Sequence, residues 1–351
     1  MAELATVGLR WFTRSGPDSD VVISSRIRLA RNLAGFPFVN RANVRQGVDI
    51  LEAAKGRITS CRHLGEGLFW VDMRDSPRLD RELLVERHLV SRQLVSAGEQ
   101  TPRGVAIGAD ETFAIMVNEE DHLRIQVLRS GMQLAEAYEQ IDRIDDALEE
   151  SLDFAFNPRF GYLTACPTNV GTGLRVSVML HLPAIKLTGQ IEKVRRAARD
   201  LHLAVRGLFG EGSEALGDLY QISNQTTLGR SEAEILADFE QTVVPQIIAY
   251  EQQARAALLR DRPDQLDDRV YRAWAVLTHA RLLTSEETFA LLSHVRLGVN
   301  LGRLDAIDLR SLNELLLICQ PAHLQRIMGK SMDPAQRRMA RAKLVRQRLG
   351  A

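Results

Sequence analysis

Apolar and polar residues alternate along much of the chain, which is the pattern of half-buried β-strands. Residues 21–29 show it clearly, and a period of two places Arg26 and Arg28 on the same face of that strand. The same pattern predicts further strands at 67–73, 104–107, 112–117, 123–129 and 174–180. Because few helical segments separate these short strands, the pattern favours an antiparallel sheet over an array of βαβ units.

Apolar residues at helical spacing predict helices at 43–60, 132–153 and 190–206. The first two segments lie between predicted strands, the third follows the last of them, and all three would cover the sheet. The predicted fold class is therefore α/β in the α+β sense, an antiparallel sheet flanked by helices.

The sequence changes character after Gly229. Ser231 and Glu234 form the pattern of a capping box, which predicts the start of a long helix reaching about residue 257. Pro263 follows in a charged segment that should break this helix. The segments beyond it are helical in pattern, at 266–282, 285–296, 311–318 and 334–348. We expect two domains, residues 1–257 with the sheet and residues 258–351 forming an all-helical C-terminal domain.

Composition and charge exclude several classes of partner. The chain has 351 residues, with 45 basic and 45 acidic side chains and a formal net charge of zero. A neutral chain has no overall field favouring nucleic acid or a membrane surface, so neither is expected as a partner. The cysteines, Cys61, Cys166 and Cys319, lie far apart, which argues against a disulfide framework and a zinc site. There is no signal-peptide pattern and no apolar run of ~18 residues, so we expect a cytoplasmic protein.

Two short segments carry the most distinctive chemistry. Residues 166–175 place Cys166 on a turn rich in proline and glycine, followed by Arg175 at the start of a strand. Residues 118–124, Asn-Glu-Glu-Asp-His-Leu-Arg, combine clustered carboxylates with another arginine. This combination suits a site that holds a cationic substrate beside a polyanionic one. A Walker-type phosphate loop is not expected, because Gly-Lys-Ser at 329–331 lacks the earlier glycine.

Together the two segments resemble the catalytic core of the guanidino (phosphagen) kinases, which transfer the γ-phosphoryl group of ATP to a guanidinium nitrogen. The resemblance implies that arginines from several strands hold the ATP phosphates. It also implies that Mg²⁺ is carried by the phosphates and water, with no metal ligand from the protein. The arginines at matching positions are Arg26, Arg28, Arg124, Arg175 and Arg206, and His88 matches the position beside the nucleotide base. The remaining residues expected at the ATP site are Ser24, Ser25, Ile27, Val176, Ser177, Val178, Met179, Gly207, Leu208, Phe209, Gly210 and Glu211.

The resemblance also implies catalytic carboxylates at Glu120 and Glu211. A guanidinium has a pKa above ~12, so its nitrogen becomes a nucleophile only as a proton leaves. A carboxylate at hydrogen-bond distance orients the guanidinium and takes that proton. Cys166 would be a third catalytic residue, a thiolate that acts electrostatically beside the guanidinium and forms no phosphoenzyme. We expect Glu119 and Asp121 to be structural partners that accept hydrogen bonds from neighbouring arginines or backbone amides.

Domain order distinguishes between branches of this family. Creatine and arginine kinases carry a helical domain ahead of the catalytic one, whereas here few residues precede Arg26 and the helical domain follows. This order resembles the bacterial protein-arginine kinases, in which the C-terminal domain mediates dimerisation and carries a phosphoarginine-binding motif, Arg-Asp-x-x-Arg-Ala. Arg337 and Arg341 match the arginines of that motif, but Arg338 replaces the aspartate and would repel a bound guanidinium. An ordinary basic amphipathic helix is the alternative interpretation of residues 335–348.

The leading hypothesis is an ATP-dependent protein-arginine kinase. By resemblance, it would act on proteins with exposed arginines in bacterial stress response, as a homodimer, with a zinc-binding activator, McsA, and a Clp-type protease as partners. One alternative is a small-molecule guanidino kinase, such as an arginine kinase. Another is an inactive adaptor that binds nucleotide or phosphoarginine without turnover. The presence of Glu120, Cys166 and Glu211 argues against the adaptor.

Overall fold

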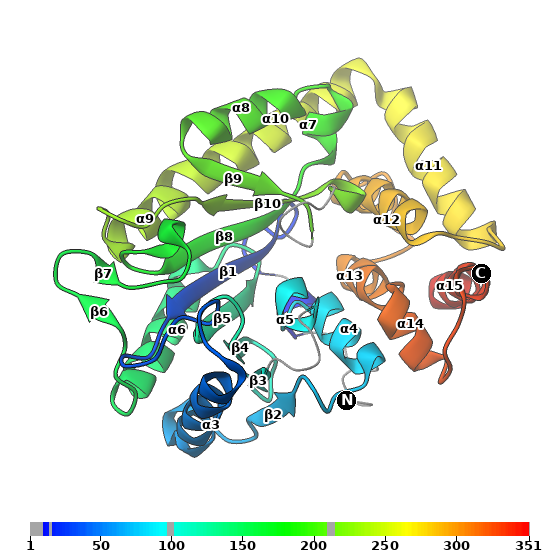
Figure 1. The fold of residues 1–351 in the computed structure, drawn as a ribbon. Coiled ribbons are helices and arrows are strands. Elements are labelled where there is room, and N and C mark those ends of the chain that lie inside the picture. The colour runs from blue at the N-terminus through cyan, green and yellow to red at the C-terminus, as the bar shows by residue number, and fades with distance from the viewer. Residues whose placement is uncertain (1–9, 14–15, 97–101, 209–214, 351) are drawn as a thin grey trace.

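The centre of the molecule is a large antiparallel sheet (Figure 1). The computed structural model describes residues 10–13, 16–96, 102–208 and 215–350. Within these ranges the sheet has eight strands in the order β2-β3-β4-β5-β1-β8-β10-β9, and β6 and β7 form a separate hairpin. The strands are β1 Val22–Arg31, β2 Phe69–Asp72, β3 Gly104–Ile107, β4 Phe113–Val117, β5 Leu123–Ser130, β6 Phe156–Asn157, β7 Gly161–Tyr162, β8 Leu174–His181, β9 Leu203–Arg206 and β10 Leu219–Asn224. The predicted antiparallel sheet is confirmed.

Strand β1 lies between β5 and β8 and sets the register of the sheet centre. Arg28 lies opposite Gln126 of β5 on one side and opposite Arg175 of β8 on the other. Arg124 of β5 pairs with Ala30 of β1. The hydrogen-bond ladders therefore gather arginines that are far apart in the sequence.

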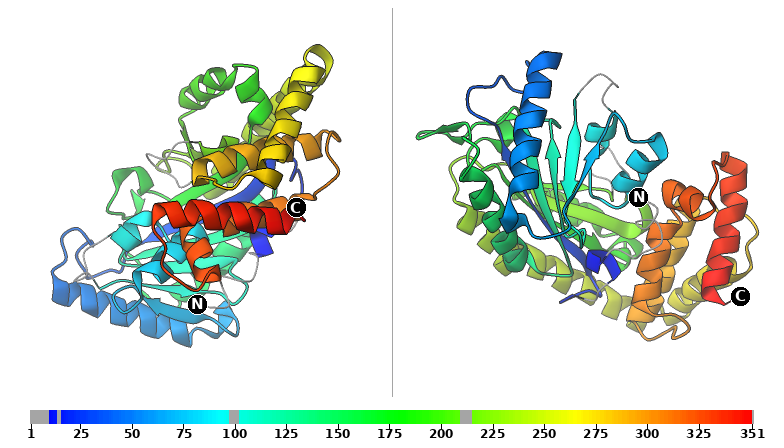
Figure 2. Two further views of the ribbon diagram at one scale, coloured as in Figure 1. Left: turned by 90° about the vertical axis from the view of Figure 1, so that its right-hand side faces the viewer. Right: turned by 90° about the horizontal axis from the view of Figure 1, so that it is seen from below.

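The two faces of the sheet differ in chemistry, as the period of two requires. One face carries Ile27 and Leu29 into a large core with helices α3 Val44–Ser60, α6 Leu134–Glu149 and α10 Val244–Asp261, which cover it (Figure 2). The opposite face carries the arginines.

Shorter helices surround this frame. The helices of the first part of the chain are α2 Arg10–Thr13, α4 Arg78–Glu86, α5 Arg92–Ser96, α7 Pro183–Leu187, α8 Ile191–Asp200 and α9 Glu232–Asp238. A π-helical turn, Phe239–Val243, joins α9 to α10 just before Pro245. The predicted capping box is confirmed, because Ser231 accepts from the amide of Glu234 while the Glu234 side chain accepts from that of Ser231.

The prediction of one helix over 190–206 is partly wrong. Helix α8 ends at Asp200, and Leu203–Arg206 forms strand β9, which pairs with β10 at the sheet edge. His202 between them has a left-handed backbone with φ of 54°, which ends the helix. The backbone of Leu203–Arg206 completes the ladder of β10, so tertiary pairing decides its conformation.

The C-terminal part is helical, as predicted. Its helices are α11 Pro263–His279, α12 Ser285–Asn300, α13 Leu309–Ile318, α14 Pro321–Ile327 and α15 Pro334–Leu349. They enclose a second hydrophobic core that also takes in Ile23, Leu128 and Met179 from the arginine-bearing face of the sheet. Helix α10 continues unbroken to Asp261, so the predicted boundary after residue 257 falls inside a helix and stays a prediction. Among the described residues, no helix is long and apolar enough to cross a membrane.

A buried polar junction joins α4 to the C-terminal helices. The Glu86 carboxylate accepts hydrogen bonds from the amides of Ala322 at 2.7 Å and His323 at 2.9 Å, and from His323 Nδ1 at 2.7 Å. It thereby satisfies the first amides of α14, which lack partners within their own helix. Arg326 adds an ion pair to Asp80 at 3.0 Å.

Removing the Glu86 carboxylate should therefore destabilise the protein strongly. We expect Glu86→Ala to lower the free energy of unfolding by about 2–4 kcal/mol, because buried donors lose their acceptor. The matched control is Glu82→Ala in the same helix, where the side chain is 39% exposed and pairs with an 86% exposed Arg78. That change should cost less than about 0.5 kcal/mol. Denaturant unfolding of both variants gives their free energies of unfolding. Equal losses would contradict the role of Glu86 as the acceptor at this junction.

Candidate functional site

A cleft of about 590 Å³ opens on the arginine-bearing face of the sheet. Its floor comes from β1, β5, β8 and β10, and its walls from α4 and α5 on one side and residues 166–173 on the other. The cleft contains most of the charged residues that the sequence singled out. These are Arg26, Arg28, His88, Glu119, Glu120, Asp121, Arg124, Cys166, Arg175 and Arg206.

The arginines form a cluster of mutually repelling cations. Burial, and then the charges of Arg124, Arg175 and Arg206, lower the pKa of Arg26 to about 9. Burial and neighbouring arginines likewise lower the pKa of Arg28. Arg28 is only 8% exposed, yet its Nε and Nη2 atoms have no hydrogen-bond partner among the described residues. The cluster concentrates positive charge and contains guanidinium donors that are buried and unsatisfied. It therefore forms a site for a polyanion such as a nucleotide phosphate.

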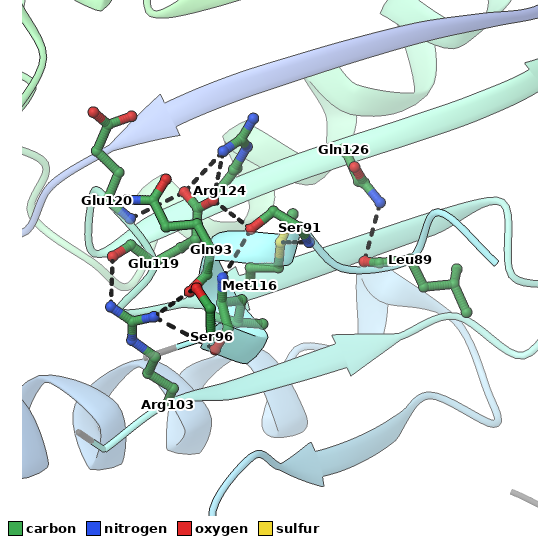
Figure 3. A network of polar contacts seen from close by, with 11 residues as sticks. Leu89, Ser91, Gln93, Ser96, Arg103, Met116, Glu119, Glu120, Arg124 and Gln126 are labelled. Carbon is green, nitrogen blue, oxygen red and sulfur yellow. Dashed lines mark hydrogen bonds and ion pairs between the residues drawn. The ribbon is translucent and has the colours of Figure 1, made fainter. Parts of the chain in front are cut away.

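Glu119 is the carboxylate that holds this cluster in place (Figure 3). It accepts from Arg124 Nη1 at 2.7 and 2.8 Å, from the Ser91 hydroxyl at 2.5 Å and from the amide of Glu120 at 3.0 Å. Burial opposes its ionisation, but Arg124 and these hydrogen bonds outweigh burial and lower the pKa of Glu119. The prediction that Glu119 is a structural partner of a neighbouring arginine is confirmed.

Glu120 differs from its neighbour. Its carboxylate is half-buried, lines the cleft and, among the described residues, has no side-chain hydrogen-bond partner. In Figure 3 it points away from the network around Glu119. Burial, followed by the charges of Asp121 and Glu119, raises the pKa of Glu120. A carboxylate of this kind is available to a cationic substrate and has a raised affinity for a proton.

Asp121 connects the acidic turn to the cysteine loop. It accepts from the amide of Ala165 at 2.7 Å and from Asn32 Nδ2 at 2.6 Å, which confirms its predicted structural role. Cys166 follows directly, and its Sγ lies 3.1 Å from the hydroxyl of Thr168. The structure thus brings Cys166 and Glu120 to the same cleft, as the sequence predicted.

Several predicted nucleotide-site residues lie elsewhere or are not described. Ser25 donates to the carbonyl of Gly131 at 2.7 Å and does not line the cleft. The side chains of Ile27 and Val176 pack into the core on the opposite face, so only their backbone is left for a ligand. Ser24, Ser177, Val178 and Met179 line a small cavity beside the cleft, and Leu208 lines both. Gly207 lines neither. Phe209, Gly210 and Glu211 lie outside the described residues.

Sequence patterns missed other residues of the cleft. Arg26 Nη2 donates to Gln221 Oε1 at 2.6 Å, but Gln221 lies on β10, which alternation did not predict. Arg175 Nη2 donates to Asn169 Oδ1 at 3.0 Å. The position of Asn169, in the same turn as Cys166, was the one signal that could have pointed to it.

Arg337 and Arg341 in the C-terminal part of the chain donate hydrogen bonds to backbone carbonyls. Arg341 is 2% exposed and donates from Nε to the carbonyl of Cys319 at 2.7 Å and from Nη1 to that of Leu283 at 2.9 Å. Arg337 Nη1 donates to the carbonyl of Met332 at 2.7 Å. A phosphoarginine site at Arg337 and Arg341 stays a prediction. Across the described part of the chain, no group of three or more His, Cys, Asp or Glu could hold a metal ion.

The cleft has the chemistry of a known family. Residues 50–254 match the ATP:guanido phosphotransferase C-terminal catalytic domain. The chain belongs to this family. Residues 263–351 match a second family, the protein-arginine kinase McsB C-terminal domain. The family resemblance inferred from residues 118–124 and 166–175 is therefore confirmed.

Relatives over nearly the full length share a name. The chain is 50% identical to a protein-arginine kinase of Symbiobacterium thermophilum over 344 residues, which is 97% of each chain. It is 47% identical to that of Halothermothrix orenii, covering 97% of this chain and 96% of the relative. It is 44% identical to that of Bacillus subtilis, covering 97% and 93%.

Solved guanidino kinases share the fold. A duplicated taurocyamine kinase from Schistosoma mansoni superposes with a TM-score of 0.62 and 29% identity, over 68% of this chain and 34% of the other. Lombricine kinase superposes with a TM-score of 0.58 and 25% identity, over 73% of this chain and 71% of the other. The predicted catalytic fold of this family is confirmed.

The contrast between Glu119 and Glu120 can be tested with isosteric changes. Glu119→Gln removes the charge that balances Arg124, so we expect ATP to bind at least about tenfold more weakly as the arginine loses its position. Glu120→Gln, one residue away, should leave the Kd for ATP within about twofold. Calorimetric ATP titration of both variants makes the comparison. Tighter ATP binding by Glu119→Gln would show that charge balance outweighs positioning.

Proposed function

We propose that this chain is an ATP-dependent protein-arginine kinase, which transfers the γ-phosphoryl group of ATP to guanidinium nitrogens of arginine side chains in proteins. The observation that carries the proposal is that one cleft contains two features. One is a cluster of arginines whose positive charge is only partly balanced, and the other is the carboxylate of Glu120, which has no hydrogen-bond partner among the described residues. Relatives named protein-arginine kinase support the choice of acceptor, because they match 97% of the chain and include the C-terminal helices.

In this proposal the arginines hold the nucleotide. Arg26, Arg28, Arg124, Arg175 and Arg206 neutralise the phosphates and stabilise charge on the transferred group. Glu119 already accepts from Arg124, and Asp121 already accepts from Asn32 and the amide of Ala165. In this proposal a metal ion would therefore be held through the nucleotide and not by these carboxylates. Bound Mg²⁺ would be held by the phosphates and would further shield their charge.

On the acceptor side, Glu120 is proposed to orient the substrate guanidinium and to take its proton as the N–P bond forms, while the bond from the γ-phosphorus to the bridging oxygen of ATP breaks and ADP leaves. Its raised pKa makes it a better base than an exposed carboxylate. We propose Glu211 as the second carboxylate of this clamp, by resemblance to the family. Cys166 is proposed to stabilise the positive acceptor electrostatically, so Cys166→Ser should reduce activity without abolishing it.

We further propose residues 1–257 as the catalytic domain and 258–351 as a domain for dimerisation and phosphoarginine binding. The family relation supports a cytoplasmic homodimer in stress response that marks proteins for a Clp-type protease and works with the zinc-binding activator McsA.

Mass spectrometry at non-acidic pH tests the proposed reaction. A casein-like protein and free arginine are incubated in parallel with the chain and Mg-ATP, and acid-labile phosphate is mapped on each. We expect phosphate on protein arginines only. Phosphate on free arginine alone would indicate a small-molecule kinase, and phosphate on neither would favour the adaptor or an obligate activator. Glu120→Gln should reduce transfer by about 10²–10⁴-fold while ATP still binds, which separates lost chemistry from lost binding.

The pH dependence of activity tests the role of Glu120. Its pKa is raised above the ordinary value of 4.5, and the base acts only when ionised. Activity is therefore present above the raised pKa and lost as pH falls through it. We expect an acid limb in kcat/KM with a midpoint above 4.5, unchanged in Cys166→Ser. The same limb in the residual activity of Glu120→Gln would assign it to a different group.

A further inference from the structure

Trp11 lies beside the cleft, in a small cavity that it shares with His88, the residue expected beside the nucleotide base. It belongs to α2, which packs between the arginine-bearing face of the sheet and the C-terminal helices. The indole is 4% exposed, and its ring meets the ring of His88 edge-on, with centroids 5.8 Å apart and an interplanar angle of 78°. Its Nε1 is buried and has no hydrogen-bond partner among the described residues. A buried indole N–H normally has an acceptor.

The surroundings of Trp11 connect it to the cleft. Trp11 and Phe12 line a small cavity of about 20 Å³. The residues that line both this cavity and the large cleft are Arg26, His88, Leu208 and Gln221. The small cavity therefore adjoins the cleft beside the arginine cluster. It is too small for a purine, so Trp11 limits how far a base can enter.

The chemistry of this end suits an uncharged aromatic ring. Burial, then the charges of Arg26 and Arg92, lower the pKa of His88 to about 3, so its ring is neutral at physiological pH. Gln126 Nε2 fixes the backbone of His88 by donating to its carbonyl at 2.7 Å. The side chains of Met179 and Leu208 supply apolar surface. An aromatic wall, a neutral imidazole and apolar side chains bind a planar base by stacking and burial.

We propose that Trp11 contacts the purine base of the bound nucleotide and closes the base end of the cleft, with its indole N–H available to an acceptor on the base. This inference rests on the proposed nucleotide site. It assigns part of that site to a segment outside the two sequence motifs.

The C-terminal helices hold Trp11 in position. Asn313 of α13 donates from Nδ2 to the carbonyl of Phe12 at 2.7 Å. Arg296 of α12 in turn donates from Nη1 to Asn313 Oδ1 at 2.6 Å, and both residues are buried. A chain of hydrogen bonds thus runs from the C-terminal domain to the residue beside Trp11. The base contact therefore depends on the docking of these helices.

Tryptophan fluorescence tests the proposal directly, because the chain has three tryptophans at well-separated positions, Trp11, Trp70 and Trp274. Trp70 is the matched control, since its Nε1 is also buried without a partner among the described residues but it lines neither the cleft nor the small cavity beside it. ATP is titrated into the wild-type protein and into Trp11→Phe, Trp70→Phe and Trp274→Phe. We expect the emission change on ATP binding to disappear in Trp11→Phe alone. Phenylalanine keeps most of the apolar contact, and a thermal unfolding curve confirms that the variant is folded.

Kinetics supply a second readout. We expect Trp11→Phe to raise the KM for ATP by roughly 2- to 5-fold and Trp11→Ala by roughly 10-fold, with kcat nearly unchanged, because only base binding is weakened. Folded Trp11→Phe and Trp11→Ala proteins with the wild-type KM and Kd for ATP would overturn the inference and leave the proposed kinase function intact. If ATP does not bind to the wild-type protein, the nucleotide site itself fails and the inference with it.

Discussion

Arginines from different strands converge on one small volume, and their mutual repulsion is the constraint on which the site depends. The ladders that pair β1 with β5 and β8 bring Arg28, Arg124 and Arg175 together, and the buried charge of Glu119 offsets only part of the repulsion. Such an arrangement costs folding free energy, which the surrounding sheet and cores must supply. The cost is largest without an anion, so the same cluster that destabilises the empty cleft favours a polyphosphate ligand.

Three consecutive carboxylates show how local contacts separate chemically identical groups. Glu119 faces Arg124 and Ser91, Asp121 faces Asn32 and the amide of Ala165, and Glu120 is left toward the cleft. Burial opposes the ionisation of all three, but at Glu119 the charge of Arg124 and the hydrogen bonds outweigh it and lower the pKa, whereas burial raises the pKa of both Asp121 and Glu120. The neighbours therefore determine the chemistry of Glu120 in two ways, by fixing the turn and by repelling its negative charge.

Prediction from sequence succeeded where a short-range pattern determines the local structure. Alternation located β1 and placed Arg26 and Arg28 on one face, and the capping box located Ser231 as the start of a helix. It failed where a distant partner decides, as at Leu203–Arg206, which becomes a strand because β10 lies beside it. Gln221 and Trp11 were missed for the same reason, since neither stands in a distinctive motif and only the tertiary structure brings Gln221 to the cleft and Trp11 to the small cavity beside it. Arg341 shows the converse, because its spacing suggests a ligand site whereas its contacts also tie α15 to the carbonyls of Cys319 and Leu283.

The two ends of the cleft are held by different parts of the molecule. The acidic turn and the Cys166 loop are fixed within the sheet domain, through Asp121 and Asn32. The end near His88 borders residues that the C-terminal helices hold, since α13 binds Phe12 and α14 binds Glu86, which precedes His88 by two positions. A displacement of the C-terminal helices would therefore change the positions of His88 and Trp11 more directly than those of Glu120 and Cys166. A signal received by those helices should change nucleotide affinity more than the phosphoryl-transfer step itself, because the groups on the acceptor side do not depend on that docking.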